Sequence, residues 1–141
     1  MNILKLTWND YQTHVSEVSR QINLSGKKYN YITGIPRGGL IPAIMISHIL
    51  NIPFIENSKL WTIDYRQSLL IDDISDSGKT LKKYSEVIDK ASIVCRISLL
   101  ERPKYYSLIV PENQWVMFPY ESSVEDSISN VNYKDRVKQY A

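Results

Sequence analysis

The stretch that decides the fold reads Leu69-Leu70-Ile71-Asp72-Asp73-Ile74-Ser75-Asp76-Ser77-Gly78-Lys79-Thr80-Leu81. Its apolar start predicts a short buried strand over residues 68–71, which ends abruptly at the adjacent carboxylates Asp72 and Asp73. A loop over 74–78 follows, and Leu81 begins the apolar face of a helix. A strand, a polar loop and a helix in this order form half of a parallel βαβ unit, in which ligands sit at the carboxyl end of the strand.

The loop has the composition of an anion cradle. Backbone N–H groups at the start of a helix can wrap a phosphate, helped here by the Ser77 and Thr80 hydroxyls and the flexible Gly78. The two preceding carboxylates would repel a phosphate but suit sugar hydroxyls and Mg²⁺. A sugar phosphate satisfies both halves of the segment.

The residues of this segment allow two other interpretations. Gly78-Lys79-Thr80 suggests a nucleotide triphosphate loop, but that signature needs a glycine five residues before Gly78, where the chain has Asp73. The segment could also be a polar loop whose serine and aspartate side chains cap a helix.

Strand and helix signals alternate through the middle of the chain. Strands are expected at residues 29–35, 52–55, 60–65, 68–71, 92–100, 108–110 and 115–118. Helices are expected after the N-cap Thr7, ending near Gly26, over 40–51, and after Gly78 with Leu81, Tyr84 and Ile88 on one face. This order predicts a single α/β domain over residues 1–141, with a mostly parallel sheet flanked by helices and a terminal helix or tail over 122–141.

Composition excludes several classes of function. The 141 residues carry 17 Lys+Arg and 15 Asp+Glu, a balance that does not indicate nucleic-acid or membrane binding. The longest nearly apolar run, 40–50, is too short for the ~20 residues of a membrane span. A single cysteine, Cys95, excludes an internal disulfide, and the amino terminus has no secretion signal, so we expect a cytoplasmic protein.

The segment 69–81 resembles the phosphoribosyl pyrophosphate motif of type I phosphoribosyltransferases. This resemblance implies an α/β fold with a small hood region. It also implies that Asp72 and Asp73 hold the ribose hydroxyls and retain Mg²⁺. The 5′-phosphate would then lie against the loop residues, which are Asp76, Ser77, Gly78, Lys79 and Thr80.

A second segment is similar to the pyrophosphate loop of purine phosphoribosyltransferases, above all the small xanthine-guanine branch. It reads Ile35-Pro36-Arg37-Gly38-Gly39-Leu40-Ile41-Pro42, with Pro36 in place of a serine. Consecutive glycines let backbone N–H groups approach an anion closely, and Arg37 adds a charge with fork geometry. Alone, the same residues could form a simple strand-to-helix turn.

A third segment, Trp115-Val116-Met117-Phe118-Pro119-Tyr120-Glu121, is similar to the part of that branch in which a tryptophan stacks on the purine. The resemblance implies that Trp115 is the stacking platform and that the backbone of Val116 reads the edge of the base. An isolated tryptophan on a strand is more often a core residue. The likeness covers roughly residues 3–121, leaving the terminal tail unmatched.

The chain departs from the family pattern in two places. Purine-specific members carry a lysine before a proline that contacts the exocyclic oxygen of the base, and here Arg102 precedes Pro103. Arginine is longer and planar, so this leaves the choice of base open. The family also places a long mobile loop before the phosphoribosyl motif, whereas only residues 66–68 separate Tyr65 from the strand. Hydrolysis, a lid from a neighbouring subunit and lost catalysis all remain open.

The resemblance implies a Mg²⁺-dependent transfer of ribose 5-phosphate to guanine, xanthine or hypoxanthine, with Asp76, Asp72 and Asp73 as catalytic residues. Asp76 would hold or relay a proton on a ring nitrogen of the base. Phosphoribosyl pyrophosphate and a purine base would be the only partners besides copies of the chain in a dimer or tetramer. The alternative is a catalytically weakened member that binds phosphoribosyl pyrophosphate or a nucleotide as a sensor, a hypothesis supported mainly by the shortened loop.

Overall fold

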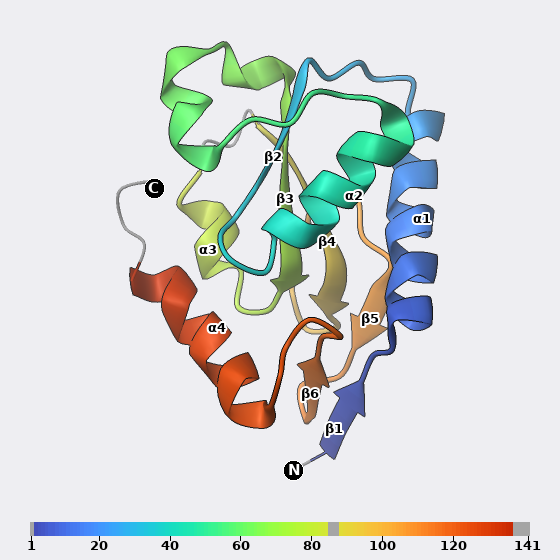
Figure 1. The fold of residues 1–141 in the computed structure, drawn as a ribbon, viewed down its shortest axis with the longest axis vertical. Coiled ribbons are helices and arrows are strands. Elements are labelled where there is room, and N and C mark those ends of the chain that lie inside the picture. Colours follow the sequence, from blue (N-terminus) through green and yellow to red (C-terminus); the bar gives the residue numbers. More distant parts are fainter. Residues whose placement is uncertain (1, 85–87, 137–141) are drawn as a thin grey trace.

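Strands and helices alternate along most of the chain, as expected. The computed structural model describes residues 2–84 and 88–136. Its elements are β1 (Asn2–Lys5), α1 (Trp8–Leu24), β2 (Tyr31–Gly34), α2 (Leu40–Leu50), the 3-10 turns η1 (Asn57–Thr62) and η2 (Tyr65–Gln67), β3 (Ser68–Ser75), α3 (Lys79–Lys82), β4 (Asp89–Arg96), β5 (Leu108–Val110), β6 (Gln114–Met117) and α4 (Val124–Arg136) (Figure 1).

The main sheet has four parallel strands in the order β2-β3-β4-β5. Leu69, Leu70 and Ile71 of β3 are fully buried because they lie in a central strand that is covered on both faces. The register places Gly34 of β2 and Ala91 of β4 on either side of Ile71. The predicted parallel α/β architecture is confirmed.

Helices and turns cover the two faces of this sheet. On one face, α1 and α2 contribute to a core cluster that includes Tyr11, Val15 and Ile46. Leu60 of η1 and Leu81 of α3 pack in a second cluster with Leu70. Alternate residues of a strand project to opposite faces, so Leu70 belongs to a different cluster from its two neighbours.

The first helix begins and ends where the sequence predicts. The Thr7 hydroxyl accepts a hydrogen bond from the Asp10 N–H at 3.1 Å, and the Asp10 carboxylate accepts one from the Thr7 N–H at 3.0 Å. This reciprocal capping box satisfies donors that the first turn leaves open. Gly26, with φ of +71°, follows the end of the helix.

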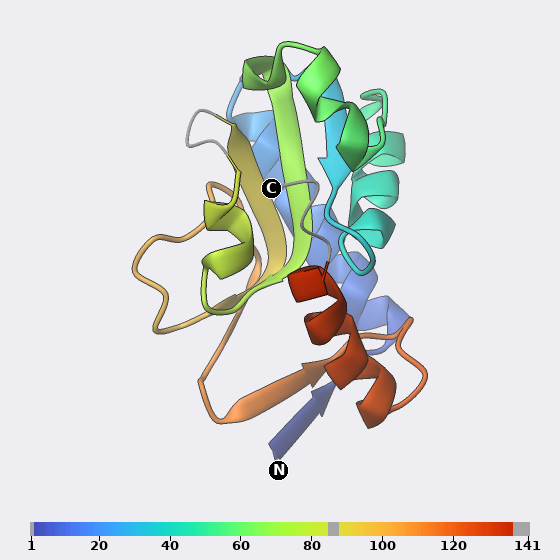
Figure 2. The same ribbon diagram turned by 90° about the vertical axis from the view of Figure 1, so that its left-hand side faces the viewer.

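A second, two-stranded sheet lies beyond the carboxyl ends of the main strands. It pairs β1 with β6 in parallel, with Ile3 opposite Trp115. Figure 1 and Figure 2 show α4 to one side of the carboxyl ends of the main strands, with its first turn near β6. The helical alternative for the terminal segment is therefore confirmed over 124–136, while 137–141 lie outside the described residues. Across the described ranges, no helix has the length and apolar character needed to cross a bilayer.

Two predicted strands are wrong. Residues 60–65 lie mostly in the 3-10 turns, where the Asp64 carboxylate accepts a hydrogen bond from the Arg66 N–H at 3.2 Å and favours a turn. The segment 52–55 contributes a single parallel bridge, between Phe54 and Ile32.

Element boundaries around the phosphate loop also differ from the prediction. Strand β3 continues through Asp72 and Asp73 to Ser75 because β4 pairs with it as far as Cys95, and backbone ladders tolerate polar side chains. Strand β4 correspondingly runs over 89–96 rather than 92–100. The helix after Gly78 ends at Lys82, so Ile88 is not part of it.

Candidate functional site

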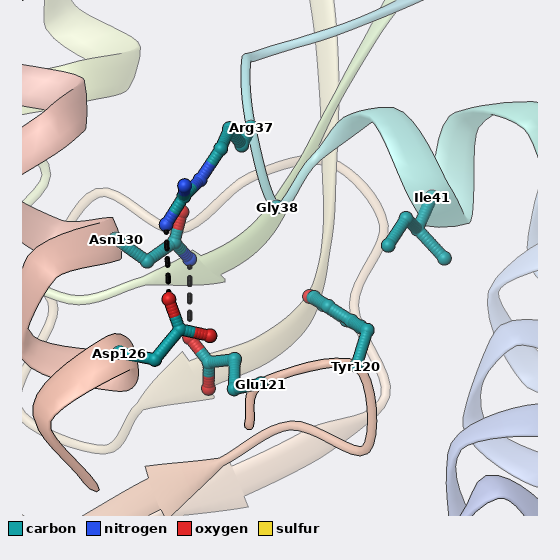
Figure 3. A pocket seen from close by; sticks show the side chains of 7 residues that line it. All are labelled: Arg37, Gly38, Ile41, Tyr120, Glu121, Asp126 and Asn130. Atoms are coloured by element: carbon teal, nitrogen blue, oxygen red, sulfur yellow. Dashed lines mark hydrogen bonds and ion pairs between the residues drawn. The ribbon is translucent and has the colours of Figure 1, made fainter. Parts of the chain in front are cut away.

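The carboxyl ends of β2 and β3 face α4 and the loop after β6, and two neighbouring cavities lie between them. Arg37 and Gly38, from the loop between β2 and α2, line the first cavity, whose volume is about 260 Å³. Tyr120, Asp126 and Asn130 line its other side (Figure 3). This is the edge at which parallel α/β sheets bind ligands.

The two glycines of this loop are required by close contacts. A Cβ at Gly38 would lie 2.1 Å from Oδ2 of Asp73, so the loop backbone touches the carboxylate of the next strand. A Cβ at Gly39 would lie 2.6 Å from the carbonyl oxygen of Ile35 and 2.7 Å from that of Ile71. The peptide bond between Pro36 and Arg37 is cis. The predicted anion loop therefore packs directly against the acidic end of β3.

The two adjacent aspartates have different surroundings. Both are buried, with 1% of Asp72 and none of Asp73 exposed. Because neighbouring strand residues project to opposite faces, only one of them can face the cavities. That residue is Asp73, whose Oδ2 accepts hydrogen bonds from the Asn130 amide at 3.1 Å and the Tyr120 hydroxyl at 3.5 Å. The structure thus brings Asp73, but not Asp72, to the predicted pyrophosphate loop.

The second cavity collects the residues predicted to handle a base. Asp76, Trp115 and Val116 line it together with Asp73, although the aspartates lie far from β6 in the sequence. The Trp115 indole N–H donates a hydrogen bond to the Ser127 hydroxyl of α4 at 2.9 Å. The volume of this cavity is about 20 Å³, which accommodates about one water molecule.

Arg96 is a residue of this cavity that sequence reasoning missed. It ends β4, and its side chain is only 6% exposed. Its Nε–H donates to the Asp76 carboxylate at 2.9 Å, and Nη1 donates to the carbonyl oxygens of Pro111 and Gln114. Nη2 has no hydrogen-bond partner within residues 2–84 and 88–136. The sequence signal that could have identified Arg96 is its position as the one charged residue of the apolar run 93–97, since a buried charge needs specific partners.

Other predicted residues lie elsewhere. Arg102 lines a third cavity, of about 450 Å³, next to Gly78 and Lys82 rather than beside Trp115. Its guanidinium donates to the Ile97 carbonyl oxygen at 2.9 Å and to the Tyr106 hydroxyl at 3.2 Å.

The predicted phosphate loop, residues 76–80, has a conformation that its glycine allows. Gly78 adopts a φ of +84°, which favours glycine, and the Ser77 hydroxyl accepts a hydrogen bond from the Lys79 N–H at 3.3 Å. Ser77 and Lys79 are exposed and Thr80 is half-buried. These side chains are accessible to a phosphate at the start of α3.

Burial dominates the electrostatics beside Asp73. It raises the pKa of Glu121, although the Phe118 N–H donates to this carboxylate at 2.8 Å. Burial likewise raises the pKa values of the Tyr11 and Tyr120 hydroxyls, with a further contribution from the negative charge of Asp73. The site thus holds several oxygen acceptors at low solvent exposure.

The donor set fits Mg²⁺ that arrives with a substrate. Mg²⁺ is held by one or two carboxylates together with substrate phosphates and water, rather than by an all-protein cage. Asp73 provides one such carboxylate at a cavity wall. Within the described ranges, no group of three or more acidic, histidine or cysteine side chains could hold a metal ion without a ligand.

Comparisons with known proteins agree with this geometry. No family model matches the chain. A xanthine-guanine phosphoribosyltransferase of Nitratidesulfovibrio vulgaris is 26% identical, with 92% of this chain and 91% of that protein aligned. The crystal structure of a purine phosphoribosyltransferase from Pyrococcus horikoshii superposes with a TM-score of 0.70 at 26% identity, covering 87% of this chain and 97% of that one. A Neisseria gonorrhoeae protein with bound ppGpp has the same fold, with a TM-score of 0.68 at 17% identity over 98% and 96% of the two chains.

Proposed function

We propose that this chain, which belongs to the type I phosphoribosyltransferase family and is close to its small xanthine-guanine members, transfers ribose 5-phosphate from phosphoribosyl pyrophosphate to a 6-oxopurine. The observation that carries the proposal is the meeting of Arg37, Asp73, Asp76 and Trp115 around two adjoining cavities at one edge of the sheet. These residues provide a cation, two carboxylates and an aromatic face, which suit the diphosphate, the sugar and the base of the two substrates.

The first cavity suits the leaving group. Arg37 supplies a permanent positive charge for the diphosphate oxygens, and the glycines let backbone N–H groups approach them. Asp73 suits the ribose hydroxyls as an acceptor and would hold Mg²⁺, which neutralises charge on the diphosphate when bound. The bond from the anomeric carbon to the diphosphate oxygen breaks with its electron pair leaving on the diphosphate. A purine nitrogen forms the new bond from the opposite face.

The residues that line the second cavity suit the base, once the space between them opens. Stacking on Trp115 would contribute about 1–3 kcal/mol, the range found for bases on aromatic side chains. Asp76 is placed to accept the proton of a ring nitrogen, and Arg96 holds that carboxylate in position. Arginine is a donor only, so the remaining N–H groups of Arg96 favour an exocyclic oxygen over the amino group of adenine. The preferred bases are therefore guanine, xanthine and hypoxanthine.

A sensor that binds phosphoribosyl pyrophosphate or a guanine nucleotide without turnover is the second candidate. It is favoured by the short connection 66–67 before β3, which leaves little chain for a hood that excludes water. The fold accommodates a guanosine nucleotide in the Neisseria gonorrhoeae protein.

The test is a chromatographic assay with phosphoribosyl pyrophosphate, Mg²⁺ and each of the four purines separately, recording both nucleotide and pyrophosphate. Asp73→Asn is the loss-of-function variant. Asp64→Asn is its matched control, because Asp64 is an exposed aspartate outside both cavities.

Nucleotide formed from a 6-oxopurine but not from adenine, abolished by Asp73→Asn and retained by Asp64→Asn, is the expected result. Pyrophosphate released without nucleotide would indicate hydrolysis instead of transfer. Binding of phosphoribosyl pyrophosphate with no reaction of any base would replace the transferase with the sensor.

A further inference from the structure

Helix α4 covers the residues that the proposed substrates need. The Asp126 carboxylate pairs with the Arg37 guanidinium at 3.3 Å (Figure 3). The Asn130 amide donates to Asp73 at 3.1 Å. Ser127, on the same helix, accepts a hydrogen bond from the indole N–H of Trp115. A single helix therefore contacts the predicted diphosphate, ribose and base positions together.

These contacts imitate those of a substrate. Asp126 presents carboxylate oxygens to Arg37, as a diphosphate would, and Asn130 presents an N–H donor to Asp73, as a ribose hydroxyl would. The ribose and the base cannot enter beside them, because Asp73 is fully buried and the cavity at Trp115 has room for about one water molecule. Glu121 and Asp126 also add negative charge to the first cavity, which opposes a diphosphate.

The face of α4 that lies on Arg37 and Asp73 makes mainly polar contacts, which a ligand could replace. Among its residues up to 130, the buried ones are the polar Ser127 and Asn130, while Ile128 is exposed. A helix that belongs to a permanent core buries an apolar stripe instead. The Arg37–Asp126 pair is partly exposed, and such pairs contribute little to stability. Asn130 Oδ1 is buried and accepts no hydrogen bond from the described residues, so this interface is incompletely satisfied.

From these observations we infer that α4 is an autoinhibitory helix, which occupies the phosphoribosyl pyrophosphate site in the resting protein and leaves it when the substrate binds. The inference rests on the proposed function, because it identifies the ligand that displaces the helix. The apparent affinity for phosphoribosyl pyrophosphate is then reduced by the fraction of molecules in which α4 is docked.

Hydrogen exchange of the full chain with and without Mg²⁺ and phosphoribosyl pyrophosphate tests the displacement. The loop 76–80 should gain protection while amides of α4 over 124–130 exchange at least several-fold faster. Protection of the loop together with equal or greater protection of α4 would show that the helix closes over the substrate or is a fixed part of the site, and would overturn the inference. No protection of the loop at saturating substrate would refute the proposed function, and the inference with it.

A matched pair of variants tests the competition in affinity. Asp126→Asn keeps an oxygen that can accept from the Ser122 N–H, a contact now 3.0 Å long, but loses the ion pair with Arg37. Glu125→Gln removes the same charge from the neighbouring, exposed position. By calorimetry, Asp126→Asn should tighten binding of phosphoribosyl pyrophosphate about threefold, the range of a partly exposed ion pair. Glu125→Gln should leave it unchanged.

Equal effects of the two variants, or none from either, would overturn the inference. Asn130→Ala is the second release variant and removes the contact with Asp73 instead. Thermal unfolding of each variant establishes that it is folded, so that Asn130→Ala can be used if Asp126→Asn is not. Tighter binding by the folded variant supports the inference, and unchanged or weaker binding contradicts it.

Discussion

Arg96 and Asp76 form an ion pair whose two members should respond differently to substitution. The Arg96 side chain is 6% exposed, whereas that of Asp76 is 51% exposed. Loss of the arginine leaves two backbone carbonyl groups of the segment 111–114 without their charged donor. Loss of the aspartate charge leaves the arginine bound to both of them. Stability should therefore depend on Arg96, and chemistry on Asp76.

The magnitudes follow from these contacts. Arg96→Met should lower the free energy of unfolding by about 3 kcal/mol, since each hydrogen bond from a charged donor is worth ~1.5 kcal/mol and the half-exposed ion pair adds little. For a chain of this length that corresponds to a decrease in Tm of about 10 °C. Asp76→Asn should cost at most ~1 kcal/mol, because its amide oxygen can still accept from Nε. It should nevertheless lower kcat by ~100-fold or more, as expected for loss of a general acid/base.

Urea unfolding and single-base turnover assays, with rates divided by the folded fraction, measure the two effects. Arg96→Lys is the control that keeps the charge and loses the fork geometry, so it should lie between wild type and Arg96→Met in stability. The reasoning would be refuted if Asp76→Asn destabilised the protein as much as Arg96→Met while turnover per folded molecule stayed normal. Asp76 would then be a structural partner of Arg96 and not a catalytic residue.

Two further predictions concern the scaffold. Burial of Asp89 opposes its ionisation, but hydrogen bonds from Lys27 and Tyr29 outweigh this effect and lower the pKa of Asp89. The ionised Asp89 therefore stabilises the folded protein above the unfolded-state pKa of ~3.9, and this stabilisation is lost as the pH falls through the lower folded-state pKa. Asp89→Asn should therefore be less stable than wild type in urea at neutral pH, and the difference should shrink as the pH falls below the unfolded-state pKa of ~3.9. A difference that does not change with pH would contradict the assignment. Gly39→Ala should destabilise by at least ~2 kcal/mol, because its Cβ meets the backbone oxygens of Ile35 and Ile71, which cannot rotate away. Gly26→Ala is the control, because its Cβ would meet no atom within 4 Å. It should destabilise the protein by only the ~1 kcal/mol that an alanine costs in the left-handed conformation. Equal destabilisation by the two variants in thermal unfolding would show that crowding at Gly39 is not the cause.

Local patterns predicted the elements whose cause is local. The capping box at Thr7 and the three- and four-residue spacing of apolar residues define α1, and the apolar run 69–71 marks the first half of β3. The continuation of β3 through its two aspartates could not be read in the same way. It depends on backbone pairing with β4, a contact between segments far apart in the chain.

The composition of the site was predicted better than its geometry. The sequence predicts Arg37, Asp73, Asp76 and Trp115 as site residues, and the fold brings them to one edge of the sheet. Arg102 was expected beside the base because it precedes a proline. Strand β4 instead ends at Arg96, four residues before the predicted end, so Arg96 reaches the cavity and Arg102 lies near Gly78.

The sequence alone determined the α/β class and predicted a phosphate loop, a diphosphate loop and an aromatic platform, since each of these depends on residue types at short spacing. Only the tertiary structure decided which of the two aspartates faces the cavities, which arginine reaches Asp76, and that α4 lies on Arg37 and Asp73. Those outcomes depend on the face of the sheet to which each strand residue projects, on where a strand ends and on the packing of a distant helix. Their physical cause is long-range contact, which leaves little trace in the local order of residues.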